Sequence, residues 1–284
     1  MTILITGCNG QLGNEMQLLE KNFPQHTWLN TDVAELDITD ADAVEQFVRE
    51  NHVDGIVNCA AYTAVDKAES DEEFCRKLNA EAPAILAKAI ERRSGWMIQV
   101  STDYVFDGTN HKPYREDEAT CPNSVYGRTK LEGEQKVLSL CQRAMVIRTA
   151  WLYSTFGNNF VKTMLRLGRE KTELGVIFDQ IGTPTYAHDL AVAIFAAIEK
   201  GVVPGIYHFS NEGVASWYDF TLAIHRLAGI ESCRVRPIHT TDYPTPATRP
   251  HYSVLDKSKI KETFGIEIPH WETSLAECIA LLKE

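Results

Sequence analysis

Short apolar runs alternate with longer amphipathic segments along the first half of the chain. The runs consist mainly of aliphatic, β-branched and aromatic residues, a composition typical of buried strands. They predict strands at residues 3–6, 27–31, 55–60, 97–101 and 145–151. The segments between them repeat apolar residues every three to four positions, which indicates helices at residues 11–21, 41–51, 72–92 and 125–140. This alternation predicts an α/β fold with a doubly wound parallel sheet.

The pattern is less regular after residue 151. It indicates helices at residues 159–170, 187–200, 217–227 and 271–283, and strands at residues 175–178 and 206–209. Residues 242–250 are rich in proline, which removes backbone donors, so an ordered loop is expected there. Because no repeat, low-complexity tract or flexible linker divides the chain, we expect a smaller, discontinuous α/β domain. Its segments would leave and re-enter the first domain.

Composition and charge narrow the class of protein. The 284 residues are 44% hydrophobic and 24% charged, which is typical of an ordered globular protein. The net charge of −11 repels polyanions, so neither nucleic acid nor an anionic membrane is an expected partner. The seven cysteines have no CxxC spacing, and the N-terminus lacks the features of a secretory signal. We therefore expect reduced thiols and a cytoplasmic protein.

A glycine-rich turn follows the first predicted strand. Residues 7–13 have the sequence GCNGQLG and open the first predicted helix. Glycines at such a turn allow a tight bend and let helix N-terminal amides approach a pyrophosphate. The spacing is GxxGxxG, and the motif alone would also suit a plain strand-to-helix connection. Its position directly after the first strand favours a dinucleotide cofactor at Gly7, Gly10 and Gly13.

Two carboxylates follow the second predicted strand. Asp32 lies about 20 residues beyond the glycines, where a dinucleotide-binding fold places the contact to the ribose hydroxyls. Asp37 follows the next short extended segment and could face the adenine, although both acids would also suit a solvated loop. Asp32 would repel a 2′-phosphate, and no Lys or Arg occurs between Met1 and Glu20 to offset it. We therefore expect NADH to be used at least as well as NADPH.

A Tyr-x-x-x-Lys motif, Tyr126 to Lys130, lies at the start of the fourth predicted helix. The four-residue spacing puts both side chains on one helix face, where the ammonium would lower the pKa of the phenol. The alternative is an exposed chance pair. Upstream, Thr102 follows the fourth predicted strand, and doubly wound sheets bind ligands at the carboxyl ends of their strands. Its hydroxyl could hydrogen-bond a substrate oxygen beside Tyr126.

These three elements, in this order, resemble the extended short-chain dehydrogenase/reductase superfamily, which has a Rossmann-like fold and a catalytic Ser/Thr, Tyr and Lys. A narrower resemblance, to the dTDP-4-dehydrorhamnose reductase family, is carried by residues 58–69, 101–108, 125–130, 148–153, 157–160, 179–185 and 243–250. It implies a reductase that uses NADH or NADPH to convert the C4 ketone of dTDP-4-dehydro-β-L-rhamnose into dTDP-L-rhamnose. The implied dinucleotide-binding domain is residues 1–150 plus about 181–204, and the implied substrate-binding domain is about 151–180 plus 205–284.

The resemblance also implies individual roles. Tyr126 would donate the proton, Lys130 would lower the pKa of Tyr126 and hold the nicotinamide ribose, and Thr102 would orient the substrate oxygen. Other cofactor contacts are expected at Asn9, Gly10, Gln11, Leu12, Asp37, Ile38, Ala60, Ala61, Tyr62 and Thr63. Substrate contacts are expected at Thr102, Asp103, Trp151, Asn158 and Arg249. Trp151 would also suit a core position, and Arg249 would also suit an exposed surface.

The resemblance leaves two further points open. Some family members bind Mg²⁺ between subunits, and Glu15 and Glu272 would suit this, but His188 stands where a third acid is wanted. No metal is therefore expected, and a homodimer is allowed. The rival functions are another nucleotide-sugar epimerase or reductase of the same fold, or a non-catalytic regulatory subunit. A dehydratase is disfavoured because Asp103 is followed by Tyr104 and not by a glutamate.

Overall fold

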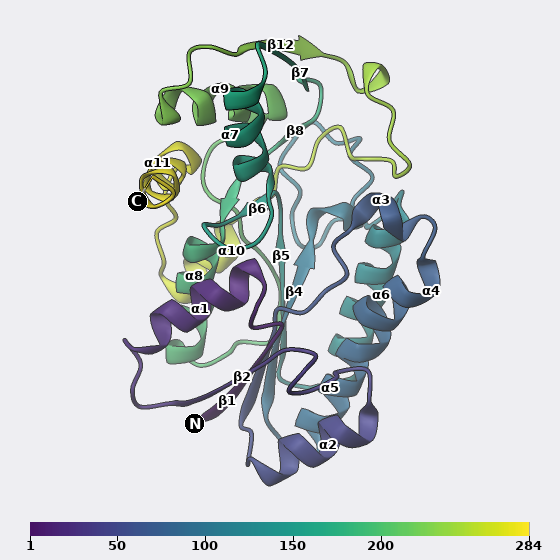
Figure 1. The fold of residues 1–284 in the computed structure, drawn as a ribbon. Coiled ribbons are helices and arrows are strands. Elements are labelled where there is room, and N and C mark those ends of the chain that lie inside the picture. Colours follow the sequence, from purple (N-terminus) through teal and green to yellow (C-terminus); the bar gives the residue numbers. More distant parts are fainter. Residues whose placement is uncertain (284) are drawn as a thin grey trace.

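The computed structural model describes residues 1–283 and has a six-stranded parallel sheet at its centre (Figure 1). The strand order is β10-β5-β4-β3-β1-β2. These strands are β1 (Thr2–Thr6), β2 (Thr27–Thr31), β3 (Gly55–Asn58), β4 (Trp96–Thr102), β5 (Ala144–Thr149) and β10 (Gly205–His208). The predicted doubly wound α/β fold is confirmed. No helix among residues 1–283 is both long enough and apolar enough to span a membrane.

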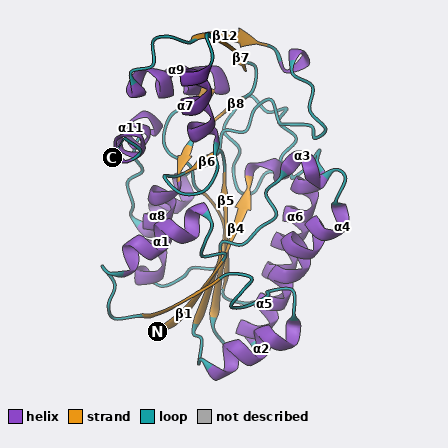
Figure 2. Cartoon of the chain, in the orientation of Figure 1, coloured by secondary structure: helices purple, strands orange, loops and turns teal. Residues whose placement is uncertain are grey.

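Helices cover both faces of this sheet (Figures 1 and 2). One face carries α1 (Gln11–Glu20) and α8 (Ala187–Lys200), and the other carries α2 (Ala41–Glu50), α5 (Ala82–Glu91) and α6 (Val125–Leu140). Successive strand residues point to opposite faces. Ile3 and Ile5 pack in the core with α1 and α8, whereas Leu4 packs in the core with α2 and α5. Both faces are apolar, which is why the strands appear in the sequence as continuous apolar runs.

A second unit lies beyond the carboxyl ends of β4 and β5, at the top of Figure 1. Its core surrounds Phe220 and is formed by α7 (Phe160–Glu170), α9 (Trp217–Ala228) and α11 (Trp271–Leu281). Its parallel strand pair is β7 (Glu173–Ile177) with β12 (Arg234–Ile238). Two shorter pairs are β6 (Leu152–Tyr153) with β9 (Thr185–Tyr186), and β8 (Ile181–Gly182) with β11 (Ala215–Ser216).

The helix expected over residues 72–92 is wrong as a single element. The chain forms α4 (Glu72–Arg76), a π-helical turn η1 (Lys77–Glu81) and then α5, and a short α3 (Val65–Ala68) precedes them. Pro83 near the start of α5 has no N–H to donate to the Asn79 carbonyl four residues earlier, which favours the wider turn. The turn lies against α6, where Gly133 leaves no room for a Cβ beside Asn79.

The expected domain division assigns residues 205–284 to the substrate-binding domain, but some of these residues belong to the central sheet and its core. β10 pairs with β5 in parallel and forms an edge of the central sheet. The unpredicted helix α10 (Ser258–Phe264) adds Ile260 and Phe264 to the core shared by α1 and α8. We therefore propose that residues 205–208 and 258–268 belong with the sheet domain, because their apolar side chains are buried there.

Candidate active site

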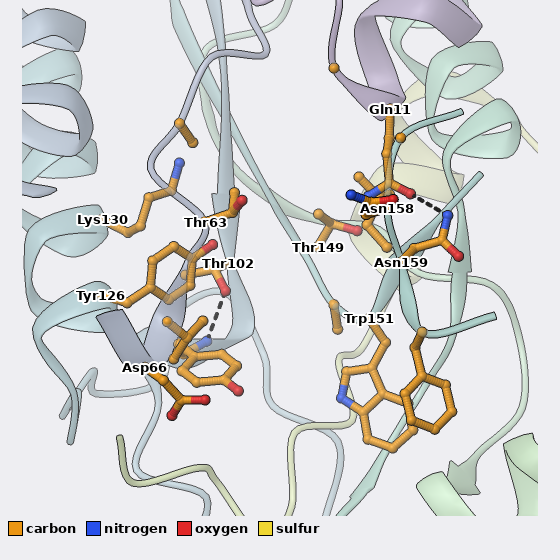
Figure 3. Close-up of a pocket in the computed structure, with 18 of the residues that line it drawn as sticks. Gln11, Thr63, Asp66, Thr102, Tyr126, Lys130, Thr149, Trp151, Asn158 and Asn159 are labelled. Carbon is orange, nitrogen blue, oxygen red and sulfur yellow. Dashed lines mark hydrogen bonds between the residues drawn. The ribbon is translucent and has the colours of Figure 1, made fainter. Parts of the chain in front are cut away.

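A cavity of about 1680 Å³ lies between the two units, at the carboxyl ends of the central strands. Ligands of doubly wound sheets bind in this position. Figure 3 shows its two walls: Thr102, Tyr126 and Lys130 lie on one, and Trp151 and Asn158 lie on the other. The first wall comes from the sheet and α6, and the second from the connections that follow β5 and from the smaller unit.

The glycine-rich turn has the backbone geometry of a phosphate cradle. Gly7 has a φ of +69°, and a Cβ on it would lie 2.7 Å from the backbone of Ala60. A Cβ on Gly13 would lie 2.5 Å from the Gly7 carbonyl oxygen, so the turn packs closely against the start of α1. Gly10 caps α1 without a side chain that could bind the first helical amides. This cradle fits the pyrophosphate of a dinucleotide.

Only some of the residues expected to bind the pyrophosphate line the cavity. Gly7, Gly10, Gln11 and Leu12 line it, whereas Asn9 and Gly13 do not. The Asn9 amide donates to the Asp32 carboxylate at 3.1 Å, and the Val33 amide donates to the same carboxylate at 2.8 Å. Asn9 and Gly13 therefore shape the turn, and Asp32 joins the turn to the end of β2.

The far end of the cavity is acidic but contains one cation. Asp32, Asp37 and Ile38 line it as expected, and so does Lys77 from the π-helical turn. Hydrogen bonds from the amide and hydroxyl of Thr39 lower the pKa of Asp37, and the charge of Lys77 acts in the same direction. The sequence argument for NADH considered cations only near the glycine turn. Lys77 is an omission from that argument, because it lies far along the chain but at the same end of the cavity.

Residues 60–63 divide between the cavity and the core. Ala60, Ala61 and Thr63 line the cavity, but Tyr62 does not. The Tyr62 hydroxyl donates to Asp71 at 3.1 Å, and its ring packs in a cluster with Cys75 and Tyr126. The Tyr62 side chain therefore lies in the core, and the cofactor contact expected at Tyr62 stays a prediction.

Helix α6 is fixed at its start by two side chains. The Ser124 hydroxyl accepts the Gly127 amide at 3.1 Å, and the Glu69 carboxylate accepts the Val125 amide at 2.8 Å. Both contacts satisfy donors that a helix start leaves free, and the carboxylate also complements the helix dipole. The first turn of α6, which carries Tyr126, is therefore held firmly at the cavity wall.

Tyr126, Lys130 and Thr102 meet at one point of the wall and are all buried. The Lys130 ammonium donates to the carbonyl of Val100 at 2.7 Å, which attaches α6 to the end of β4. The Thr102 hydroxyl accepts the Tyr104 amide at 3.2 Å, and the Tyr104 ring packs edge-on against Tyr126 with centroids 5.4 Å apart. The structure thus brings the expected hydroxyl, phenol and ammonium together.

The electrostatics of this trio differ from the expectation. Burial raises the pKa of Tyr126, a hydrogen bond with Thr102 acts against the rise, and the charge of Asp103 adds to it. Burial also lowers the pKa of Lys130 to about 8. The net pKa of Tyr126 is therefore raised and not lowered as expected, because desolvation of the phenol dominates. Tyr126 keeps its proton at neutral pH, and Lys130 remains largely charged.

Two buried oxygens in this region have no hydrogen-bond partner among residues 1–283. One is Oδ2 of Asp103, and the other is the hydroxyl of Thr149, which lines the cavity. Burial raises the pKa of Asp103 to about 6, although a hydrogen bond from Thr102 opposes the rise. Buried polar groups in proteins are nearly always hydrogen-bonded, so both oxygens are candidates for contact with a ligand.

The opposite wall is built around Trp151, which has a φ of +50°. A bulky side chain in this backbone region is strained, and such strain occurs most often at functional sites. The ring stacks on Trp217 with centroids 3.5 Å apart and planes 7° apart, and the Trp217 indole N–H donates to Gln180 at 3.2 Å. A Cβ on Gly182 would lie 2.7 Å from the Trp151 ring. Trp151 follows β5, which ends earlier than expected, and it lines the cavity.

Arg249 is held in a bidentate ion pair at the edge of this wall. Its two terminal nitrogens donate to the two carboxylate oxygens of Asp66 at 2.7 and 3.0 Å. The Ala247 amide also donates to Asp66, so this carboxylate ties α3 to the proline-rich loop. The hydrogen bonds from Arg249 lower the pKa of Asp66. Arg249 and Asp66 both line the cavity, as does the exposed Asn158 on the other side.

Comparison with known proteins agrees with this geometry. The RmlD substrate binding domain family matches residues 1–284. A dTDP-4-dehydrorhamnose reductase of Aggregatibacter actinomycetemcomitans is 41% identical in an alignment 283 residues long that covers 96% of each chain. The chain belongs to the dTDP-4-dehydrorhamnose reductase family. Another relative, from Streptomyces antibioticus, is named a probable dTDP-4,6-dihydroxy-2-methyloxan-3-one 4-ketoreductase; it is 43% identical over 98% of this chain and 94% of its own.

Solved structures of dTDP-4-dehydrorhamnose reductases share the whole fold. The crystal structure of the Clostridium acetobutylicum protein has a TM-score of 0.96, 44% identity and full coverage of both chains. That of the Bacillus anthracis protein, in complex with NADP, has a TM-score of 0.95, 38% identity and 99% coverage of both chains. The family expected from the sequence is confirmed.

Several residues that line the cavity were not among the site residues expected from the sequence. Lys77, Thr149, Gln180 and Trp217 line it, and so does the ion-pair partner Asp66. Asp66, Thr149 and Gln180 lie within segments that carried the family resemblance, so their polar side chains gave a usable signal. Lys77 and Trp217 lie outside those segments, and only the folded arrangement brings them to the site.

The acids considered for a metal are not brought together. Glu15 is buried, accepts the Ser154 hydroxyl at 2.6 Å and lies 3.3 Å from the His188 ring nitrogen. Glu272 forms an ion pair with Arg226 elsewhere. Within residues 1–283, no three His, Cys, Asp or Glu side chains form a group suited to a metal ion. We propose no metal site.

Proposed function

We propose that the chain reduces the C4 ketone of dTDP-4-dehydro-β-L-rhamnose to dTDP-L-rhamnose, with NADH or NADPH as cofactor. The observation that carries this proposal is the meeting of Tyr126, Lys130 and Thr102 at one cavity with the Gly7 turn. Names of relatives that are more than 40% identical support the choice of a dTDP-4-keto sugar.

The reaction adds a hydride to the carbonyl carbon and a proton to the carbonyl oxygen. The nicotinamide cofactor supplies the hydride when it is bound. Tyr126 supplies the proton to the oxygen, because burial raises the pKa of its phenol and keeps it protonated at neutral pH. Thr102 orients the same oxygen with its hydroxyl. The product is an alcohol, and the phenolate regains its proton from solvent.

We propose for Lys130 the two roles that the resemblance implies, one toward Tyr126 and one toward the nicotinamide ribose. Its ammonium donates to Val100 and, with a pKa lowered to about 8 by burial, is mostly charged at neutral pH. A positive charge at this position stabilises the phenolate that forms when Tyr126 loses its proton. Its remaining N–H groups are available to the hydroxyls of the nicotinamide ribose.

The second wall recognises the nucleotide sugar. We propose that Asp103, Trp151 and Asn158 contact the sugar. We also propose that Arg249 contacts the diphosphate through the N–H groups that do not bind Asp66. Asp66 holds Arg249 in place and keeps its side chain from folding away. The net charge of −11 otherwise repels a polyanionic ligand, so this local cation is necessary.

The proposal also covers the oligomeric state and the cellular location of the protein. A homodimer is compatible with the family, and light scattering on the purified chain would test it. A cytoplasmic location agrees with the seven cysteines, none of which forms a disulfide within residues 1–283.

A panel of nucleotide sugars tests the proposed function. The purified chain should oxidise NADH or NADPH with dTDP-4-dehydro-β-L-rhamnose, and more slowly with 4-keto sugars that carry another base or sugar configuration. Turnover of a nucleotide sugar without net cofactor consumption would instead indicate an epimerase. Cofactor binding without turnover of any member of the panel would favour the non-catalytic regulatory role.

A further inference from the structure

Helix α6 carries a third buried polar side chain in line with its two functional residues. Tyr126, Lys130 and Glu134 follow one another at four-residue intervals, which places them on one face of the helix. Glu134 is only 1% exposed. It does not line the cavity and was not among the expected site residues.

Glu134 is fully engaged by two strands of the central sheet. The Arg148 guanidinium on β5 donates to both carboxylate oxygens, at 2.8 Å from Nη2 and 3.0 Å from Nε. The Ser101 hydroxyl on β4 donates to the same carboxylate at 2.5 Å. Ser101 and Arg148 are register partners, and His208 on β10 is the next in the same row. Burial and the charge of Arg148 lower the pKa of His208 to about 3, so it is neutral.

Such a buried pair is weak as a device for stability. Apolar residues of similar volume usually stabilise a core at least as well as a desolvated ion pair. The position of the pair is therefore informative, because Glu134 is buried on the helix face of Lys130 and does not line the cavity. The sequence places its anion one helical turn beyond the ammonium.

The groups facing Lys130 leave Glu134 as the balancing charge. The titratable side chains that act on it are Glu134, Cys75 from α4 and Cys59 after β3. Burial raises the pKa of Cys59 to about 12 and also raises the pKa of Cys75, so both thiols are neutral at physiological pH. Tyr126 on the same helix is neutral for the same reason. Desolvation opposes the charge on Lys130, and the Glu134 carboxylate supports it.

We propose that Glu134 is a positioning residue of the active site: its buried carboxylate keeps the Lys130 ammonium charged, while Arg148 and Ser101 hold that carboxylate in place. This inference rests on the proposed function, in which Lys130 acts as a cation beside Tyr126. Glu134 would be a third member of the Tyr126–Lys130 motif, because a charged Lys130 at a buried position requires a nearby anion.

The test measures the protonation of Lys130 itself. Competitive labelling with acetic anhydride across a pH series, read by peptide mass spectrometry, gives the midpoint for each lysine without turnover. Glu134→Gln leaves Arg148 buried and unpaired and is at risk of misfolding. The double variant Glu134→Gln/Arg148→Met removes both charges, so it can be measured even if the single variant misfolds. Glu132→Gln is the matched control, because Glu132 lies on the same helix but pairs with Arg76 and Lys136 on the surface.

The midpoint of Lys130 should fall by about 1 to 2 pH units in a folded Glu134→Gln protein, which loses one nearby anion at an effective dielectric near 20. It should fall by less in the double variant, because the positive charge of Arg148 is lost as well. The alkaline limb of kcat/KM should move to lower pH by the same amount, and Glu132→Gln should move neither. A Lys130 midpoint that falls in neither folded variant would overturn the inference. A midpoint that falls in a chain unable to reduce any 4-keto sugar would support the role of Glu134 and reject the proposed function.

Discussion

The two walls of the cavity differ in how they are built. Thr102, Tyr126 and Lys130 lie on a regular strand and helix and are each under 10% exposed. Thr102 and Lys130 bind backbone groups, and Tyr126 packs against Tyr104. Trp151 and Arg249 lie in connections, one with a left-handed φ and the other held by an ion pair to a distant helix. The first wall is therefore rigid and fixed locally, as a proton donor requires. The second depends on contacts between remote segments, which suits the selection of a substrate.

The largest expected effect is on the first wall. Tyr126→Phe keeps the ring but removes the proton, so kcat should fall by roughly 10² to 10⁴, the usual contribution of a general acid. The dissociation constant of NAD(P)H should change little, because the glycine turn is untouched. Tyr62→Phe is the matched control: its hydroxyl binds Asp71 outside the cavity, and kcat should stay near the wild-type value. Retention of more than half of kcat by Tyr126→Phe would remove this tyrosine from the mechanism.

On the second wall, Arg249→Met should act on the substrate and not on the cofactor. Loss of this cation beside a diphosphate should lower kcat/KM for the nucleotide sugar by roughly 10- to 100-fold. Arg249→Lys should restore only part of it, because an ammonium lacks the planar fork. Steady-state kinetics with cofactor binding measured separately would check both points. A change of less than twofold in Arg249→Met would show that the arginine only anchors the loop.

The adenine end should give a smaller effect. Asp32→Asn removes a charge but keeps an oxygen for the Asn9 and Val33 amides, so the ratio of kcat/KM for NADPH to that for NADH should rise by about 3- to 10-fold. Lys77→Gln should move the ratio in the opposite direction. Ratios that neither substitution alters would place the 2′ position of the ribose away from both side chains.

The smallest expected effect is on stability. Burial raises the pKa of Asp103 to about 6, above the ordinary value near 4 of an unfolded chain. The folded state therefore holds this proton more tightly, and its advantage is lost as the pH rises from 4 through 6. Asp103→Asn should be more stable than the wild type by about 1 to 3 kcal/mol at pH 7.5, with little difference at pH 4.

Thermal unfolding at the two pH values would test this, with Asp107→Asn as the control of opposite sign. Backbone hydrogen bonding to Thr109 lowers the pKa of Asp107, so that variant should lose stability at pH 7.5. An Asp103→Asn protein that is less stable at both pH values would show that hydrogen bonding, and not desolvation, dominates at Asp103.

Features that depend on local order were accessible from the sequence. The parallel sheet follows from runs such as Ile3-Leu4-Ile5, which are buried on both faces, and the pairing of Tyr126 with Lys130 follows from helical spacing. The sequence-based predictions that were wrong or incomplete depend on a backbone detail, on burial or on a contact between distant residues. The missing N–H of Pro83 divides the helix expected over residues 72–92, and desolvation reverses the expected pKa shift of Tyr126. No local pattern could show that Trp217 would stack on Trp151.

Transfer of deuterium from the cofactor to the sugar tests the central claim most directly. The purified chain would be given dTDP-4-dehydro-β-L-rhamnose and NADH or NADPH deuterated at both C4 positions of the nicotinamide, and the product examined by mass spectrometry and NMR. The account predicts one deuterium at C4 of the product sugar and one cofactor oxidised for each sugar reduced. A product without deuterium at C4, or turnover without cofactor oxidation, would contradict it.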